Sequence, residues 1–246
     1  MSPRPSERGL TATQPSMPVK ARHELKYFLN QCDYLALRGN IGAVLRPDPN
    51  ADALGDYAIR SLYFDDAYNS AYRDKIAGNQ DRDKYRIRIY NLSGQKIILE
   101  RKRKLGSLIA KSSAPITRRL CDQLIAGDPT GLEKSNHPLL TDMYRMMRTR
   151  LLRPVVIVDY MREAYIHPAQ RVRVTFDKRL RTGLMSKALF DPGLPTVQAL
   201  DDEQVILEVK FDHYLPVYID RMLTGCETPR TAISKYVICR RFEPIQ

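Results

Sequence analysis

The 246-residue sequence contains no tryptophan, only four cysteines and only four histidines. Cys32, Cys121, Cys226 and Cys239 are scattered and form no C-x-x-C pair. This pattern is typical of reduced, mostly buried thiols in a cytosolic protein rather than of a disulfide framework. The histidines are dispersed as well, so a zinc site is not expected.

Several sequence signatures of other protein classes are also absent. No apolar run approaches the roughly 18 residues that a membrane-spanning helix requires. The N-terminus carries Arg and Pro but lacks the apolar core of a signal peptide. No G-x-x-x-x-G-K-[ST] phosphate loop and no aromatic motif of the RNP type occur, which argues against a Walker-type NTPase and a common class of RNA binder.

Positive charge is abundant instead. Lys and Arg number 40 against 28 Asp and Glu, which gives a net charge of +12. Such a balance predicts an anionic partner, whether nucleic acid, a membrane surface or phosphates. Four prolines in residues 1–19 predict a disordered arm, and a hydrophobic fraction of 43% is enough for a core in the domain expected over residues 20–246.

The stretch Lys84–Lys104 predicts two strands joined by a short turn at Asn91–Gln95. Because side chains alternate along a strand, Lys84, Arg86 and Arg88 share one face, and the apolar residues between them share the other. Taken alone, this hairpin favours an antiparallel ribbon that has one face in water, and only its recurrence along the chain favours another interpretation.

The same alternation recurs in at least five predicted strands, often with the pattern Glu-x-Lys on the polar face. Strands are predicted over 22–28, 59–65, 84–90, 96–104, 109–116, 155–163, 170–177 and 205–212. Helices are predicted over 31–45, 69–75, 117–152, 217–223 and from 231 onwards. Arginine dominates the polar faces and is the residue best suited to bidentate phosphate contacts. If the sheet closes, its polar face would line a wet tunnel with helices outside, and a polyanion would relieve the repulsion between the cations.

Several motifs together resemble one family. They are R-x-E-x-K-Y at 22–27, Y-R-I-R-I-Y at 85–90, L-E-R-K at 99–102, R-E-A-Y at 162–165, R-V-T-F-D at 173–177, L-E-V-K-F at 207–211 and S-K-Y at 234–236. In this order, over about residues 22–241, they resemble the VTC domain, the catalytic domain of polyphosphate polymerases in the triphosphate tunnel metalloenzyme (CYTH-like) superfamily. The resemblance implies an α+β fold, an antiparallel eight-stranded β tunnel barrel with helices packed on the outside. It also implies a nucleoside triphosphate inside and Mn²⁺ or Mg²⁺ as cofactor.

The resemblance also assigns roles to individual residues. The catalytic phosphate ligands fall on Lys26, Arg86, Arg88, Lys102, Arg162, Arg173 and Lys210. Further substrate-binding cations are expected at Arg22, Lys84, Arg171 and Lys235. The metal-binding carboxylate falls on Glu208, with Glu24 and Glu100 as auxiliary metal ligands or orienting partners. Two simpler interpretations stay open: Lys210 could only pair with Glu208 or Asp212, and Lys235 could only cap a helix.

One departure from the superfamily pattern separates two activities. Hydrolytic members open with E-x-E-x-K, whereas Arg22 stands here at the first acidic position. A carboxylate for a second metal is thereby replaced by a cation, as in the polymerase branch. We therefore predict an ATP-dependent polyphosphate polymerase, with an inorganic or nucleotide triphosphatase and a non-catalytic polyphosphate- or RNA-binding module as alternatives.

The expected partners are ATP and polyphosphate, without specific recognition of nucleic acid. Eukaryotic family members carry a phosphate-sensing domain and a membrane portion that this sequence does not show, so a separate membrane protein is considered as a partner. The expected location is cytoplasmic, including a peripheral position at the inner face of the membrane. The sequence does not predict an oligomeric state.

Overall fold

The computed structural model describes residues 22–52, 55–106, 108–169, 171–224 and 229–243. The arm predicted over residues 1–19 lies outside these ranges. Eight strands form the main path of one antiparallel sheet. They are β1 (His23–Leu29), β3 (Asp56–Asp65), β4 (Arg82–Tyr90), β5 (Ser93–Leu105), β6 (Leu108–Pro115), β7 (Arg153–Ile166), β8 (Arg173–Thr182) and β10 (Val205–Phe211).

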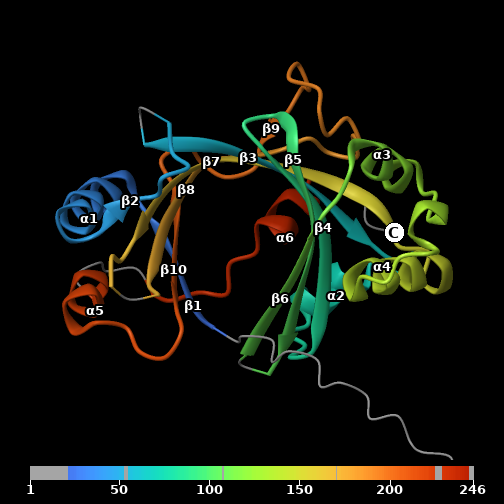
Figure 1. The fold of residues 1–246 in the computed structure, drawn as a ribbon. Helices are drawn as coiled ribbons and strands as arrows, with labels where there is room; N and C mark the ends of the chain where they lie inside the picture. Colours follow the sequence, from blue (N-terminus) through green and yellow to red (C-terminus); the bar gives the residue numbers. More distant parts are fainter. Residues whose placement is uncertain (1–21, 53–54, 107, 170, 225–228, 244–246) are drawn as a thin grey trace, which may run out of the picture.

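The sheet curls strongly, and its strand order is β1-β10-β8-β7-β3-β4-β5-β6 (Figure 1). The short strand β2 (Arg46–Pro47) pairs with β7, and β9 (Val197–Gln198) pairs with β8. The two edge strands approach each other, and an isolated antiparallel bridge joins Arg22, just before β1, to Ile109 of β6. The predicted eight-stranded antiparallel tunnel fold is therefore confirmed as a curled sheet whose edges meet at this bridge.

Helices cover the apolar outer face of the sheet (Figure 1). On one side, α1 (Gln31–Val44) and α5 (Val217–Thr224) pack with the apolar residues of β8 and β10. On the other, α3 (Arg118–Ala126), the 3₁₀ helix η1 (Thr130–Leu132) and α4 (Pro138–Thr149) cover Ile87 and Ile89 of β4 and Leu99 of β5. These three side chains are fully buried, so the apolar face predicted from alternation is the packed one.

Two helices take other positions. The short α2 (Ser70–Ile76) follows β3, and α6 (Lys235–Arg240) lies within the curve of the sheet (Figure 1). Tyr236 of α6 is buried and its hydroxyl contacts Asp65 at the end of β3. This contact holds α6 on the polar side of the sheet.

Local chemistry sets the boundaries of several elements. Asn91 and Leu92 both have positive φ (49° and 54°), so the β4–β5 hairpin turns over two residues, tighter than the five predicted. The single helical region predicted over 117–152 divides because Gly127 ends α3 in the left-handed conformation, with φ of 83°. The last helix begins at Lys235 rather than Thr231 because the Ser234 side chain caps it.

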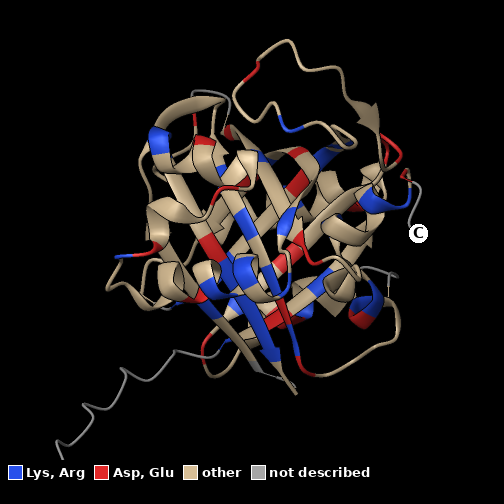
Figure 2. Cartoon of the chain, turned by 90° about the vertical axis from the view of Figure 1, so that its right-hand side faces the viewer, with Lys and Arg blue, Asp and Glu red and all other residues tan. Residues whose placement is uncertain are grey.

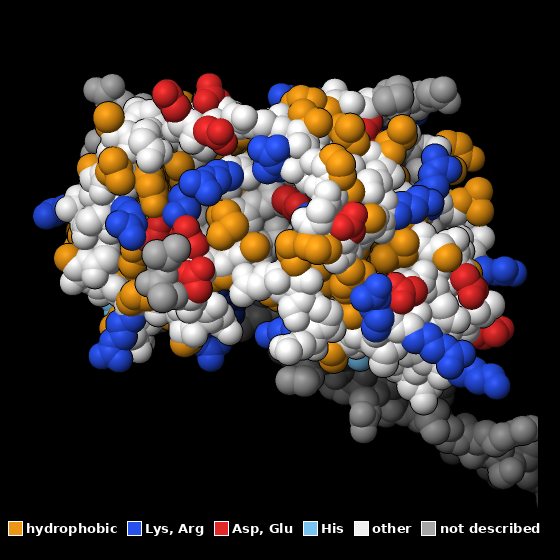
Figure 3. All heavy atoms as spheres, turned by 90° about the horizontal axis from the view of Figure 1, so that it is seen from above, with side chains coloured by type: hydrophobic (Ala, Val, Ile, Leu, Met, Phe, Trp, Pro, Cys, Tyr) orange, Lys and Arg blue, Asp and Glu red, His pale blue; other side chains and the backbone are white. Residues whose placement is uncertain are grey.

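The outer surface differs in character from the polar side of the sheet. Seen from above, hydrophobic, basic and acidic side chains are mixed on the outer face (Figure 3). In the view onto the right-hand side of Figure 1, Lys and Arg gather instead along neighbouring strands (Figure 2). None of the helices in the described part of the chain is both long and apolar enough to cross a membrane.

Candidate active site: a basic tunnel

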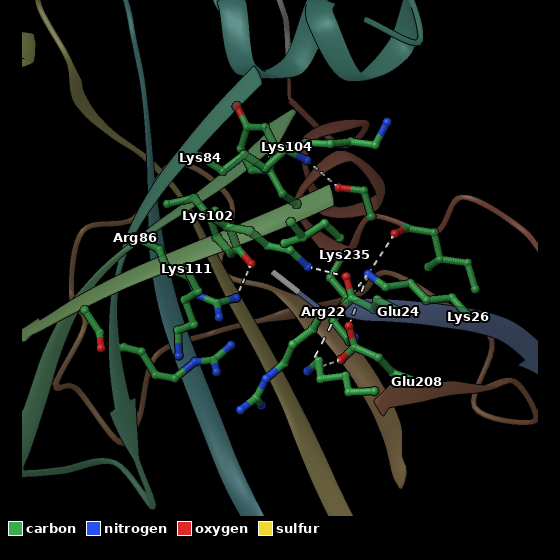
Figure 4. A pocket seen from close by; sticks show the side chains of 18 of the residues that line it. Arg22, Glu24, Lys26, Lys84, Arg86, Lys102, Lys104, Lys111, Glu208 and Lys235 are labelled. Atoms are coloured by element: carbon green, nitrogen blue, oxygen red, sulfur yellow. Dashed lines mark hydrogen bonds and ion pairs between the residues drawn. The ribbon is translucent and has the colours of Figure 1, made fainter. Parts of the chain in front are cut away.

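The curled sheet encloses a cavity of about 1610 Å³ on its polar side. Twelve of the fourteen predicted site residues line it, and they come from six strands, from α6 and from the residue before β1 (Figure 4). They are Arg22, Glu24, Lys26, Lys84, Arg86, Arg88, Lys102, Arg162, Arg173, Glu208, Lys210 and Lys235. Residues that alternate along each strand therefore point into one cavity, where side chains far apart in the sequence come together.

Two predicted residues do not line this cavity. Arg171 precedes β8, which starts at Arg173 rather than at residue 170 as predicted. Its side chain is 66% exposed and lies 3.6 Å from Asp212, so the structure gives it a surface ion pair instead of a place in the tunnel. Glu100 is buried in β5, where it pairs with Arg86 and Lys111 of the neighbouring strands.

Glu100 orders the arginines of β4. Arg86 donates through Nε to Glu100 Oε2 at 2.7 Å, and Arg88 Nη1 lies 3.9 Å from the same oxygen. Lys111 of β6 also pairs with Glu100. Although burial favours the neutral acid, Arg86 and Arg88 hold the pKa of Glu100 far below its usual range. The carboxylate thus remains ionised and fixes the direction of Arg86.

The opposite wall is formed by β1 and β10, where two Glu-x-Lys pairs lie side by side. Glu24 is opposite Lys210 in the ladder, and Lys26 is opposite Glu208. Glu208 lies 3.0 Å from Lys210 and 3.4 Å from Lys26, while Glu24 lies 3.8 Å and 4.0 Å from the same two ammonium groups. Lys102 of β5, the strand next to the edge strand β6, pairs with Glu24 of β1, so this ion pair reinforces closure (Figure 4).

A third cluster of charged side chains joins β7, β8 and α6 through Asp177, a residue to which the sequence analysis gave no role. Arg162 donates to Asp177 in bidentate geometry, at 2.6 and 2.8 Å. Lys235 Nζ lies 2.5 Å from Asp177 Oδ2, which brings the α6 lysine into the tunnel. Asp177 is the last residue of the R-V-T-F-D motif and shares a face with Arg173, so the alternation contained a signal for it.

Sequence reasoning also missed three tyrosines that line the cavity. Each hydroxyl accepts a hydrogen bond from a tunnel arginine: Tyr63 from Arg86 (2.8 Å), Tyr160 from Arg88 (3.0 Å) and Tyr57 from Arg173 (2.8 Å). The hydroxyls are neutral acceptors that position the guanidinium groups. Arg86 and Arg173 also pair with the carboxylates of Glu100 and Asp48, whereas Arg88 lies 3.9 Å from Glu100 and keeps its charge more available to an anion. The signal was again the spacing of two, since Tyr160 stands two residues before Arg162.

Lys84 allows a pH test of this electrostatic description. It donates to Ser234 Oγ at 2.9 Å, and burial, followed by Arg82, Lys102 and Lys75, lowers the pKa of its ammonium group to about 7. In an unfolded chain a lysine titrates near pH ~10.4. Between these two values the unfolded chain binds more protons, so stability rises with pH, and below about pH 7 the charged lysine carries its full cost.

We therefore expect Lys84→Met to raise the melting temperature more at pH 6 than at pH 9. Thermal unfolding at both pH values measures the difference, with the exposed Lys134→Met as the matched control. An equal change at the two pH values would contradict the lowered pKa of Lys84.

Comparisons with known proteins agree with this geometry. The family model of the VTC domain matches residues 21–242. No curated protein matched the chain. Among solved structures, a candidate adenylate cyclase from Bacillus halodurans superposes with a TM-score of 0.54 at 8% identity, over 87% of this chain and 94% of that one. A protein from Pyrococcus horikoshii OT3 gives a TM-score of 0.47 at 11% identity, over 90% of this chain and 99% of that one. At such low identity, the Bacillus halodurans structure shows a shared fold.

Proposed function

Because the chain belongs to the VTC-domain family, we propose that it is a polyphosphate polymerase that uses ATP. It transfers the γ-phosphate of ATP to the end of a growing phosphate chain inside the tunnel. The observation that carries this proposal is the convergence of cations from both walls of the sheet and from α6 on one cavity. Phosphoryl transfer passes through a loose transition state, so catalysis depends mainly on positioning and on neutralising charge.

The tunnel supplies both of these requirements. Arg86, Arg88 and Arg173 are each held by a tyrosine hydroxyl and present planar guanidinium groups that suit phosphate oxygens. Lys26 and Lys210 supply further charge from the opposite wall. The terminal phosphate of the acceptor chain is already anionic and needs no general base, so this set of cations is sufficient to align donor and acceptor.

Two of the three predicted metal ligands fit a divalent cation. Glu24 and Glu208 line the same cavity from adjacent strands, and the buried Glu24 Oε1 has no hydrogen-bond partner among the described residues. Carboxylate oxygens are the ligands that Mg²⁺ and Mn²⁺ prefer, and such ions keep water and substrate phosphates as remaining ligands. No group of three or more His, Cys, Asp or Glu side chains that could hold a metal ion gathers in the described ranges.

We assign Glu208 and Glu24 to the metal, and Glu100 to the positioning of Arg86. When bound, the cation would neutralise charge on the phosphate oxygens. The protein's own contribution is to hold the Glu208 carboxylate in place between Lys26, Lys210 and Arg162, at 3.4, 3.0 and 3.5 Å.

Arg22 supports polymerisation over hydrolysis. It lines the cavity beside the bridge to Ile109, and its Nε lies 3.0 Å from Asp212. A guanidinium here cannot bind a second metal ion or help to activate water, but it can hold an anionic chain.

We expect the purified protein, given ATP and Mn²⁺, to form ADP and chains of many phosphates, with free phosphate as the minor product. Arg22→Glu should shift the product ratio towards free phosphate, because it places a negative charge beside the polyanion. Gel resolution of polyphosphate together with a free-phosphate assay measures the ratio. Arg171→Glu, which changes another cation paired with Asp212 but outside the tunnel, is the matched control. Release of free phosphate alone by the unmodified protein would identify a triphosphatase instead.

A reducing compartment suits the described cysteines. Cys32, Cys121 and Cys239 are free thiols, and burial raises the pKa of the last two well above the usual range for a thiol. Buried and protonated, the thiols of Cys121 and Cys239 are poor nucleophiles. We propose a cytoplasmic location on this ground, where ATP is available as the phosphate donor.

A further inference from the structure

One end of the β4–β5 hairpin carries cations on its inner face that have no role in the site described above. Arg82 and Lys104 lie directly opposite each other in the ladder, and Lys84 and Lys102 form the next inward-facing pair. Lys75 of α2 lies close to both Arg82 and Lys104. Arg82, Lys104 and Lys75 all line the same cavity as the active-site residues and are half-buried.

Like charges directly opposite each other in an antiparallel ladder destabilise the sheet. Further along the same face, Arg86 opposes Glu100, so charge is compensated there. At Lys84–Lys102 and Arg82–Lys104 each cation faces another cation. Glu24 compensates the charge of Lys102, so Arg82–Lys104 is the pair whose repulsion no carboxylate of the described chain relieves by an ion pair.

The outer face of the same strands shows that this is not a general property of the hairpin. There Asp83 opposes Arg103 and lies 3.9 Å from it, and Asp83 also lies 3.3 Å from Arg101. At this end of the hairpin a carboxylate therefore stands on the outer face, at Asp83, while the inner-face pairs on either side of it contain only cations. The excess of positive charge is confined to the tunnel side.

In the described part of the chain, Arg82 and Lys104 donate hydrogen bonds only to neutral groups, whereas Lys102 pairs with Glu24. Arg82 donates to the Asn79 carbonyl and Lys104 to the Gln80 side-chain oxygen. Asp74 lies close enough to favour the charged form of Arg82, but its Oδ1 accepts from Asn79 and it forms no ion pair with Arg82 in the described chain. Burial, Arg82 and Lys104 together lower the pKa of Lys75, as expected for cations held close together.

We propose that Lys75, Arg82 and Lys104 form a second anion subsite, which binds the phosphate chain beyond the three phosphates held in the active site. Successive inward-facing residues are ~6.6 Å apart along a strand, so the Arg82–Lys104 pair lies ~13 Å from the Arg86–Glu100 pair. Lys84 and Lys102 bridge this interval and make the row of cations continuous (Figure 4). The subsite rests on the proposed function for its physiological ligand, and it makes affinity depend on chain length.

Binding without catalysis tests the subsite. Calorimetric titration in the presence of EDTA compares tripolyphosphate with a polyphosphate chain longer than the tunnel. The double variant Arg82→Gln/Lys104→Gln should weaken binding of the long chain by about tenfold or more, since hydrogen bonds with charged groups are worth at least this factor. Tripolyphosphate affinity should stay unchanged.

Arg103→Gln is the matched control, because it removes a cation next to Lys104 in sequence but on the outer face of β5. It should affect neither ligand. Thermal unfolding should show the double variant at least as stable as the parent protein, because it relieves a like-charge pair.

Equal weakening of both ligands would overturn the proposal by placing Arg82 and Lys104 in the triphosphate site. Unchanged binding of both ligands, or binding of a single-stranded oligonucleotide with the same dependence on Lys104, would overturn it as well. These outcomes are independent of the polymerase assay. A protein that makes no polyphosphate can still bind long chains more tightly than tripolyphosphate, and a polymerase can lack this dependence of affinity on chain length.

Discussion

Glu208→Gln is expected to lower polyphosphate synthesis by about 100-fold or more, the order of effect that even an outer partner of a metal site can reach. An amide offers one neutral oxygen where the carboxylate offers two charged ones, so it coordinates a hard cation poorly. Turnover of ATP with Mn²⁺ or Mg²⁺ measures the loss. The exposed Glu203→Gln serves as the control for a change of one acidic residue.

The fold should survive this change, because each cation around Glu208 keeps another partner. Arg162 retains Asp177, while Lys26 and Lys210 retain Glu24. Tripolyphosphate binding in EDTA should be no weaker than in the parent protein, since a negative charge has been removed from the tunnel. Activity close to that of the parent protein would remove Glu208 from the mechanism.

Arg88→Gln is expected to lower kcat/KM for ATP by about 1000-fold, the lower range observed when an arginine that stabilises transferring phosphate is lost. Arg88 is 5% exposed and donates to Ser61 and Tyr160, both neutral, while its nearest carboxylate oxygen is 3.9 Å away. Its charge is therefore less compensated than that of Arg86 or Arg173, which both pair with a carboxylate.

Arg88→Lys separates charge from geometry, because lysine keeps the charge but cannot form a planar bidentate contact. We expect it to recover only part of the activity. Arg119→Gln on the exposed face of α3 is the control and should leave steady-state kinetics unchanged. If Arg88→Gln behaves like this control, Arg88 does not contact the transferred phosphate.

The inward and outward faces of the strands could be predicted from the sequence because alternation is a local property. Lys84, Arg86 and Arg88 line the cavity while Ile87 and Ile89 are buried under helices, as their spacing predicts. The sequence predicts the hairpin between the correct strands, but its turn is shorter than predicted and several strands begin or end two to five residues from the predicted positions. Arg171 was misplaced because its strand begins two residues later, and a strand end is not determined by alternation.

Closure of the sheet and completion of the site depend on contacts between distant segments. The bridge between Arg22 and Ile109 and the ion pair between Lys102 and Glu24 join opposite edges of the sheet, and no local pattern specifies them. Asp177 binds both Arg162 and Lys235 only because α6 enters the curve of the sheet. Alternation places Asp177 on the face of Arg173, but its contact with Lys235 becomes visible only in the folded chain.

The strict alternation in β4 limits how this family can change over evolutionary time. Deleting or inserting one residue within Tyr85–Ile89 would turn Arg86 and Arg88 towards the helices and their apolar neighbours into the tunnel. Both the packed core and the phosphate site would be lost in one step. Length variation in related genes should therefore be confined to connections such as the Asn91–Leu92 turn, while the strands diverge only by substitution.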